Sequence, residues 1–361
     1  MDNELEKLEG ETFFEDDNKD VPPSDIVAYN ELRSCADLFR MYEQGILEVQ
    51  PEFQREVVWR DPDQTRFIDS IIKQLPIPSM CFSLDYKSQK WQVIDGLQRI
   101  SSVIRFLGDK DWKLSNLEDI DKEIAGKRTS IFKKKGDPLY PLYLRVQNLT
   151  LPITVLRCDY SKRSHKNYLF TIFHRLNSGG MKLNNQEIRN CIFFGSFNQF
   201  LKECNKTKYW VTLQDIKEDR VYRFTKIELV LRFFAFYDTA SKYTGKLARF
   251  LNDYMDQNRD LDEVDLENKR NLFVETTKLI CEKITNNSEF EKIPVSVFEA
   301  VMYGVAKNIN HLKSLNSAKV KKLYKELKES DNFSLPKLKS GVTDKEKLID
   351  RLKAAENIFS K

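Results

Sequence analysis

Residues 91–107 have the sequence WQVIDGLQRISSVIRFL, and this stretch decides the fold of the first half of the chain. The segment up to Asp95 is mostly apolar, and from Leu97 onward apolar residues recur at helical spacing. Gly96, between the two, suits a tight connection because glycine tolerates backbone angles that other residues avoid. The stretch therefore predicts a strand, a turn and a helix in direct succession.

More strands and helices are expected on both sides of this unit. The segment MCFSLDY (80–86) predicts a strand that is joined to WQVID by the turn-like Lys87-Ser88-Gln89. Two helices are expected earlier, at 32–45 and at 61–74, the second with Asp61 as N-cap and Pro62 at its first position. After an irregular, basic segment at 108–141, strands are expected at LYLRV (142–146) and LPITVLRCDY (151–160).

Helical periodicity dominates the second half of the chain. Helices are expected at 161–176, 185–193, 225–241, 246–257, 261–285, 294–307, 317–329 and 343–359. The predicted fold class is thus α+β, with an acidic, disordered leader at 1–25, an α/β domain at 26–160 and an all-helical domain at 161–361 whose C-terminal part is basic.

Composition narrows the class of protein. With 361 residues and 41% hydrophobic content, the chain has room for two folded domains. No apolar run approaches the roughly 20 residues of a membrane span, and the acidic start lacks the features of a signal peptide, so a cytoplasmic protein is expected. The six cysteines form no C-x-x-C pair, and there are only three histidines. Reduced, buried thiols are therefore expected, without a zinc site or an HNH-type nuclease centre.

Charge is distributed unevenly along the chain. Residues 1–25 contain ten acidic side chains against two lysines, whereas from Lys307 onward Lys and Arg are about twice as frequent as Asp and Glu. This basic region is suited to contact the phosphates of DNA. The alternative is a solvated helix face, and it is favoured because acids are interleaved with the lysines.

The connection at 95–99 has the features of an anion site. Gly96 permits close backbone approach, the helix that follows offers unpaired N–H groups, and Arg99 adds a fork of donors for phosphate oxygens. Asp95, at the carboxyl end of a strand, is placed to hold Mg²⁺ or to orient an attacking water. The alternative for these residues is a strand-to-helix cap with a structural arginine.

Two further clusters carry polar residues that are typical of binding sites. In VQPEFQREVVW (49–59), Gln54, Arg55 and Trp59 suit phosphate binding and stacking on a base, although a core position for Trp59 and an ion pair for Arg55 are the favoured alternative. In IFHRLNSGGMKLNNQEIR (172–189), a helix is expected to end near Asn177 and another to start after Asn184.

This helical hairpin could serve as a helix-turn-helix motif, but ordinary hairpins are far more common than DNA-reading ones. Glu187 and Arg189 within it are expected to be salt-bridge partners rather than catalysts. His174, on an otherwise apolar face, is expected to be a buried or capping residue.

In this order, the three clusters and Pro76-Ile77-Pro78 resemble the N-terminal domain family of GmrSD-type restriction enzymes, over about residues 30–250. The family's signatures are P-x-F/Y-Q-R-x-x-V-W, P-I-P, D-G-Q-Q-R and R-L-N-x-G-G followed by Q-E-I-R. The resemblance implies a ParB/sulfiredoxin-like α/β domain followed by a helical domain. It also implies that the D-G-Q-Q-R loop binds and hydrolyses a nucleoside triphosphate.

The resemblance also assigns roles to residues. It implies that Asp95 orients a metal (Mg²⁺) or water, that Gln98 positions water or phosphate, and that Arg99 neutralises charge on the transferring phosphoryl group. The remaining members of the expected site are Gln54, Arg55 and Gly96 as phosphate-binding residues and Trp59, Asn177, Glu187 and Arg189 as accessory residues. Leu97 departs from the family, since it stands where the first Gln is usual.

Three functions remain open from the sequence. The first is a Mg²⁺-dependent nucleotidase that gates action on modified or foreign DNA, with cleavage by a nuclease partner because no HNH domain is expected in the chain. The second is a sensor that binds nucleotide or DNA without turnover. The third is a ParB-like nuclease that acts directly on DNA. An oligomer is compatible with each, and no membrane partner is expected.

Overall fold

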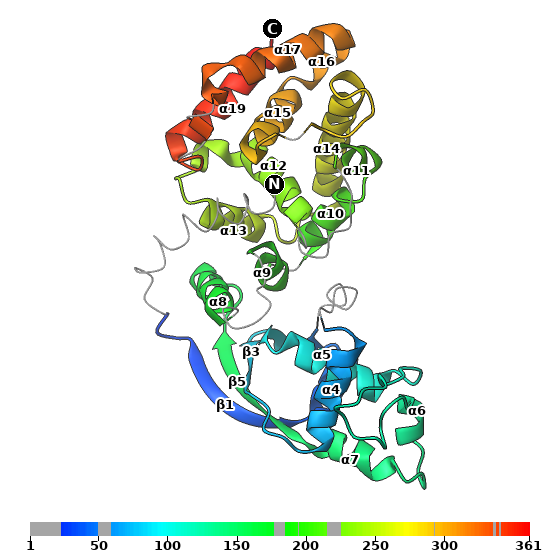
Figure 1. Cartoon of the computed structure of the whole chain (residues 1–361). Helices are drawn as coiled ribbons and strands as arrows, with labels where there is room; N and C mark the ends of the chain where they lie inside the picture. The colour runs from blue at the N-terminus through cyan, green and yellow to red at the C-terminus, as the bar shows by residue number, and fades with distance from the viewer. Residues whose placement is uncertain are drawn as a thin grey trace. The chain divides into compact units, whose positions relative to one another are not determined.

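The computed structural model describes residues 23–49, 59–176, 185–193, 195–214, 225–291, 293–334, 337–338 and 341–361. The chain divides between residues 182 and 183 into two compact units. We call the described residues before this division the sheet unit and those after it the helical unit (Figure 1).

The sheet unit contains a five-stranded mixed sheet with the order β1-β5-β3-β4-β2. The strands are β1 (Val27–Ser34), β2 (Leu47–Glu48), β3 (Met80–Asp85), β4 (Lys90–Asp95) and β5 (Thr150–Cys158). The central strand β3 is buried along its whole length, pairing in parallel with β5 and in antiparallel with β4. The predicted hairpin of β3 and β4 is confirmed, and Gln89 closes its turn with a φ of +57°.

The described helices of the sheet unit are α2 (Cys35–Glu43), α4 (Asp61–Ile72), α5 (Leu97–Gly108), α6 (Thr129–Phe132), α7 (Tyr140–Asn148) and α8 (Arg163–Leu176). Helices α2, α4, α5, α6 and α7 share a hydrophobic core with this sheet, and α8 contacts β4 (Figure 1). Ile68 of α4 and Ile100 of α5 are fully buried together with Phe82 of β3. Helix α5 contacts α2 and α4, so its position is fixed by packing along its length.

Two expectations for this unit were wrong. Residues 142–146, predicted as a strand, lie in helix α7, which has Pro141 in its first turn. A five-residue apolar run does not distinguish a strand from a helix segment, and proline is well tolerated at a helix start. Conversely, strand β1 was not predicted, and the helix expected from residue 32 begins only at Cys35, after Ser34 accepts a hydrogen bond from the Asp37 backbone (3.1 Å).

Helices make up the helical unit, as the sequence predicts. They are α9 (Asn185–Ile192), α10 (Ser196–Cys204), α11 (Lys208–Leu213), α12 (Thr225–Thr239), α13 (Leu247–Gln257), α14 (Glu263–Lys283), α15 (Val295–Lys307), α16 (Ile309–Ser314), α17 (Ser317–Glu329) and α19 (Lys345–Phe359). The short helices α10, α11 and α16 were not predicted. Helices α15 and α19 approach closely at Gly304, where a Cβ atom would lie 2.7 Å from the Phe359 ring. The α+β class is thereby confirmed.

The described residues also bear on two expectations from composition. All six cysteines are free and buried, as expected for reduced thiols. None of the helices in the described ranges is both long enough and apolar enough to cross a membrane. The leader expected at 1–25 falls mostly outside the described residues, which begin at Pro23.

Candidate functional site

The connection between β4 and α5 turns on a single glycine. Gly96 has a φ of +96° and a ψ of 14°, a left-handed conformation that L side chains rarely adopt. A Cβ atom at this position would lie 2.5 Å from Cγ of Met80. Glycine is therefore required for two reasons. The backbone angle disfavours other residues, and Met80 leaves no room for a Cβ atom.

The N-terminus of α5 presents backbone donors that its own helix does not use. The first intrahelical bond runs from the Ile100 N–H to the Gly96 carbonyl (2.9 Å), so the N–H groups of Leu97, Gln98 and Arg99 have no partner in the helix. The N-cap is glycine, no described side chain caps this end, and the first turn contains no acidic residue. An uncapped helix start of this kind favours an anion.

Arg99 joins the end of β4 to the segment before β3. Its Nη2 atom lies 2.6 Å from Oδ2 of Asp95, and its Nη1 atom donates to the carbonyl oxygens of Pro78 (2.5 Å) and Ser79 (3.4 Å). The Arg99 side chain is 15% exposed and that of Asp95 38%. Arg99 therefore has the structural role that the sequence left open. Asp95 is the more accessible member of the pair.

Gln98 joins the 95–99 loop to the end of the 49–59 segment. Its Oε1 atom accepts a hydrogen bond from the backbone N–H of Trp59 (3.2 Å), and the Trp59 carbonyl accepts one from Gln64 (3.0 Å). The Trp59 ring packs edge-on against Phe67, with ring centroids 5.5 Å apart, and is partly buried against the core. Trp59 thus has the core position that was the alternative to stacking on a ligand.

Leu97, the departure from the family pattern, packs against the hydrophobic core of the sheet unit. Its side chain therefore faces the protein. A glutamine is not needed at this position for the start of α5, and leucine contributes apolar contact there.

The structure brings together only part of the predicted site. Asp95, Gly96, Gln98, Arg99 and Trp59 lie at the same end of α5 in the sheet unit. The predictions for Gln54, Arg55 and Asn177 fall outside the described residues.

Glu187 and Arg189 belong to α9 of the helical unit and are almost fully buried. Arg189 donates from Nε to Oδ1 of Asn252 (2.9 Å) and forms an ion pair with Glu228, with 3.6 Å between Nη1 and Oε2. A buried guanidinium held by these partners acts in packing and in satisfying neighbouring polar groups. The salt-bridge role expected for Arg189 is thereby confirmed.

The described part of the chain contains no group of three or more His, Cys, Asp or Glu residues arranged to hold a metal ion. Asp95 is a single carboxylate, and only its Oδ2 atom is engaged by Arg99. Mg²⁺ is commonly held by one or two carboxylates together with substrate phosphates and water. The 95–99 loop fits that arrangement only when a phosphate supplies the further ligands.

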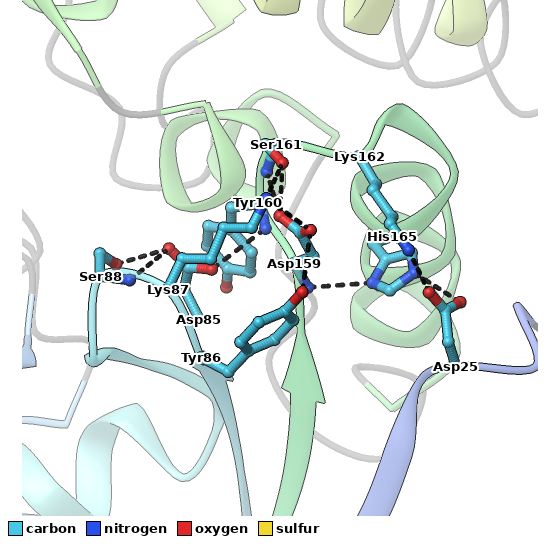
Figure 2. A network of polar contacts seen from close by, with 10 residues as sticks. All are labelled: Asp25, Asp85, Tyr86, Lys87, Ser88, Asp159, Tyr160, Ser161, Lys162 and His165. Carbon is cyan, nitrogen blue, oxygen red and sulfur yellow. Dashed lines mark hydrogen bonds and ion pairs between the residues drawn. The ribbon is translucent and has the colours of Figure 1, made fainter.

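A polar network that the sequence did not predict surrounds His165 (Figure 2). The ring is 1% exposed, and its Nδ1 atom accepts a hydrogen bond from the backbone N–H of Asp159 (3.0 Å). The proton of a neutral ring is then on Nε2, which lies 2.9 Å from Oδ1 of Asp25. Asp25 lies 140 residues earlier in the chain, so no local sequence signal pointed to this contact.

The network controls the ionisation of two carboxylates. Hydrogen bonds from Lys162 and His165 lower the pKa of Asp25 to about 2. The Ser161 hydroxyl and the Lys87 ammonium hold the pKa of Asp159 well below its usual value. Both ring nitrogens of His165 are occupied, and the contacts tie the start of β1 to the end of β5 and to α8 (Figure 2). The arrangement is that of a structural clasp.

Comparison with models of known protein families identifies part of the sheet unit and the start of the helical unit. Residues 35–194 match the family model of the GmrSD restriction endonuclease, N-terminal domain. This match covers all of the motif clusters quoted above, and it confirms the resemblance inferred from the sequence. No curated protein and no solved structure gave a significant match.

Proposed function

We propose that the sheet unit binds a nucleoside triphosphate at the 95–99 loop and hydrolyses it in the presence of Mg²⁺, as part of a restriction module that acts on DNA. The match to a restriction endonuclease domain points to DNA as the partner of the module. The observation that carries the nucleotide site is the uncapped start of α5 beside the Asp95–Arg99 pair.

The backbone provides the first part of the site. The N–H groups of Leu97, Gln98 and Arg99 and the positive end of the α5 dipole attract phosphate oxygens. Arg99 adds a positive charge that is already held in place by Asp95 and the Pro78 carbonyl. Preorganised donors of this kind stabilise charge without reorganisation during the reaction.

Asp95 provides the second part. Its carboxylate is the more exposed member of the pair, and Oδ1 forms no hydrogen bond or ion pair with the described residues. The proposed role of Asp95 is to orient the attacking water or to hold Mg²⁺, which would neutralise charge on the phosphates. Gln98 is proposed to place its amide near the same phosphates while its Oε1 atom holds Trp59.

The segment that carries Gln54 and Arg55 completes the proposal. Trp59, the last residue of the 49–59 cluster, donates its backbone N–H to Gln98 of the 95–99 loop. We assign Gln54 and Arg55 to phosphate binding. Glu187 and Arg189 are assigned to packing within the helical unit. The proposal for the whole module also includes modified or foreign DNA as its target, a nuclease as its partner, and assembly into an oligomer.

The first test is phosphate release from GTP and ATP with Mg²⁺, with and without DNA. Wild type is compared with Arg99→Ala and with Arg66→Ala. Arg66 is the matched control because it forms an ion pair of similar length with Asp119 (2.7 Å) on the same unit, and neither residue belongs to the 95–99 loop. Release that is lost in Arg99→Ala and kept in Arg66→Ala supports the proposal, and no release under any condition contradicts it.

A second comparison separates turnover from binding. Asp95→Asn keeps an oxygen acceptor for Arg99 but removes the charge, so nucleotide binding is expected to survive while phosphate release collapses. Binding without release in wild type would favour a sensor. Metal-dependent nicking of DNA that disappears in Asp95→Asn would favour a direct nuclease.

A further inference from the structure

The irregular segment after α5, residues 109–137, contains eight Lys and Arg residues against seven Asp and Glu residues, and its contacts bring several of the cations together. Lys113 and Arg128 face each other in an antiparallel bridge, and the Leu114 N–H bonds to the Lys127 carbonyl (2.9 Å). The Ser130 N–H bonds to the Lys110 carbonyl (3.2 Å), so Lys110 also lies beside this pair. Short helix α6 follows directly and is succeeded by Lys134 and Lys135.

These contacts gather cations from two stretches of sequence. We define the basic surface by its exposed members, which are Lys110, Lys113, Lys127, Arg128, Lys134 and Lys135. Lys133 lies beneath them, half-buried, and donates to the Asp109 carbonyl (3.4 Å). Burial lowers the pKa of Lys133; the charge of Asp109 raises it, and the charge of Lys110 lowers it.

Most cations of this surface form no ion pair with the described residues, although Asp109, Asp111 and Asp137 lie in the same segment. Among the described residues, the only ion pair of the basic surface joins Arg128 to Asp111 at 3.9 Å, and that aspartate is 95% exposed. The C-terminal helices contain lysines of both kinds. Lys328, Lys347 and Lys361 each pair with a carboxylate, whereas other exposed lysines of these helices form no ion pair with the described residues. The paired lysines agree with the favoured alternative for the C-terminal region, a solvated helix face with acids interleaved among the lysines.

Local stability does not explain this arrangement. Like charges directly opposite one another in an antiparallel pair are destabilising, and Lys113 and Arg128 hold such positions. Charges that repel in the free protein are neutralised when a polyanion binds, with release of its counterions. A line of phosphates fits the unpaired cations better than a small anion does, because the cations are spread over two chain segments and a helix end.

Helix α5 connects this surface with the candidate nucleotide site. Its N-terminus carries Arg99, and Lys110 follows its last residue, Gly108, closely. A helix of 12 residues spans about 18 Å, and most of α5 is buried in the core. The candidate nucleotide site and the basic surface thus lie at opposite ends of α5.

We infer that the basic surface binds the phosphate backbone of duplex DNA. This inference deepens the proposed function and rests on it for the choice of DNA among polyanions. The contacts are to phosphates, so binding is independent of base sequence and depends steeply on salt.

The test uses the full chain and a fluorescent DNA duplex at several salt concentrations. The variant Lys113→Gln/Lys127→Gln/Lys134→Gln/Lys135→Gln removes four charges of the basic surface. The matched control, Lys319→Gln/Lys322→Gln/Lys345→Gln/Lys353→Gln, removes the same charge from exposed lysines of the helical unit for which the described residues provide no ion pair. The first variant is expected to bind at least about tenfold more weakly than wild type and to show a salt slope smaller by roughly 3, whereas the control changes little.

Several outcomes would overturn the inference. They are equal weakening in the control, an unchanged salt slope in the first variant, no duplex binding by wild type at low salt, and tighter binding of single-stranded RNA than of duplex DNA. Phosphate release without DNA is measured in parallel and is expected to be the same in all three proteins. Loss of DNA binding with intact release, or the reverse, then separates a failure of this inference from a failure of the proposed nucleotidase.

Discussion

The Nη2 atom of Arg99 lies 2.6 Å from Oδ2 of Asp95, across the glycine turn that joins β4 to α5. The pair therefore links the carboxyl end of a strand with the first turn of the next helix. Arg99 also reaches the Pro78 carbonyl, so one side chain fixes three parts of the loop. The proposed chemistry depends on this arrangement, since Asp95 is oriented before any ligand arrives.

Replacing Arg99 by lysine tests this geometry. An ammonium is a point donor and cannot hold Asp95 and the Pro78 carbonyl with the fixed fork of a guanidinium. We expect Arg99→Lys to lose about 1 kcal/mol of stability and at least about tenfold in phosphate release, with nucleotide binding less affected. Urea unfolding and steady-state release measure the two effects. Release equal to that of wild type would show that charge alone is sufficient.

Gly96→Ala is expected to be among the most damaging single changes in the loop. The backbone strain at a φ of +96° adds to the clash with Met80, for a loss of about 2–4 kcal/mol in the free energy of unfolding. Gly45→Ala is the matched control, because Gly45 has a φ of +64° with nothing within 4 Å of the position that a Cβ atom would take, and strain alone costs about 1 kcal/mol. Similar losses in both variants would mean that Met80 moves aside freely.

The sequence predicts those parts of the site that depend on neighbouring residues in the chain. The succession of strand, Gly96 and helix is visible in residues 91–107, because apolar spacing changes at that glycine. The partners of Arg99 and Gln98 were not predictable, since Pro78 and Trp59 lie 21 and 39 residues away. Similarly, β1 is an edge strand whose residues are mostly exposed, so it lacks the alternation that indicates a half-buried strand.

Leu97→Gln restores the residue that is usual in the family. Because Leu97 packs against the core, the change is expected to cost about 1 kcal/mol and to leave phosphate release no higher than in wild type. Leu75→Gln is the control, since Leu75 is 49% exposed and its replacement is expected to be nearly neutral. The variants are compared by thermal unfolding and by phosphate release. A clear gain in release by Leu97→Gln would mean that a glutamine at this position reaches the ligand.

The clasp around His165 predicts a specific dependence of stability on acid. The pKa of Asp25 is about 2 in the folded chain against a usual value of 3.8, so its contacts with Lys162 and His165 stabilise the folded state fully above 3.8. This contribution is lost as the pH falls from 3.8 to about 2, because the carboxylate must then be protonated. Asp25→Asn is expected to lower the melting temperature at neutral pH and to make its decline between pH 4 and pH 2 shallower. Asp111→Asn, at a site that is 95% exposed, is the control for removal of one charge. A decline of unchanged steepness in Asp25→Asn would show that the clasp does not hold the start of β1 in solution.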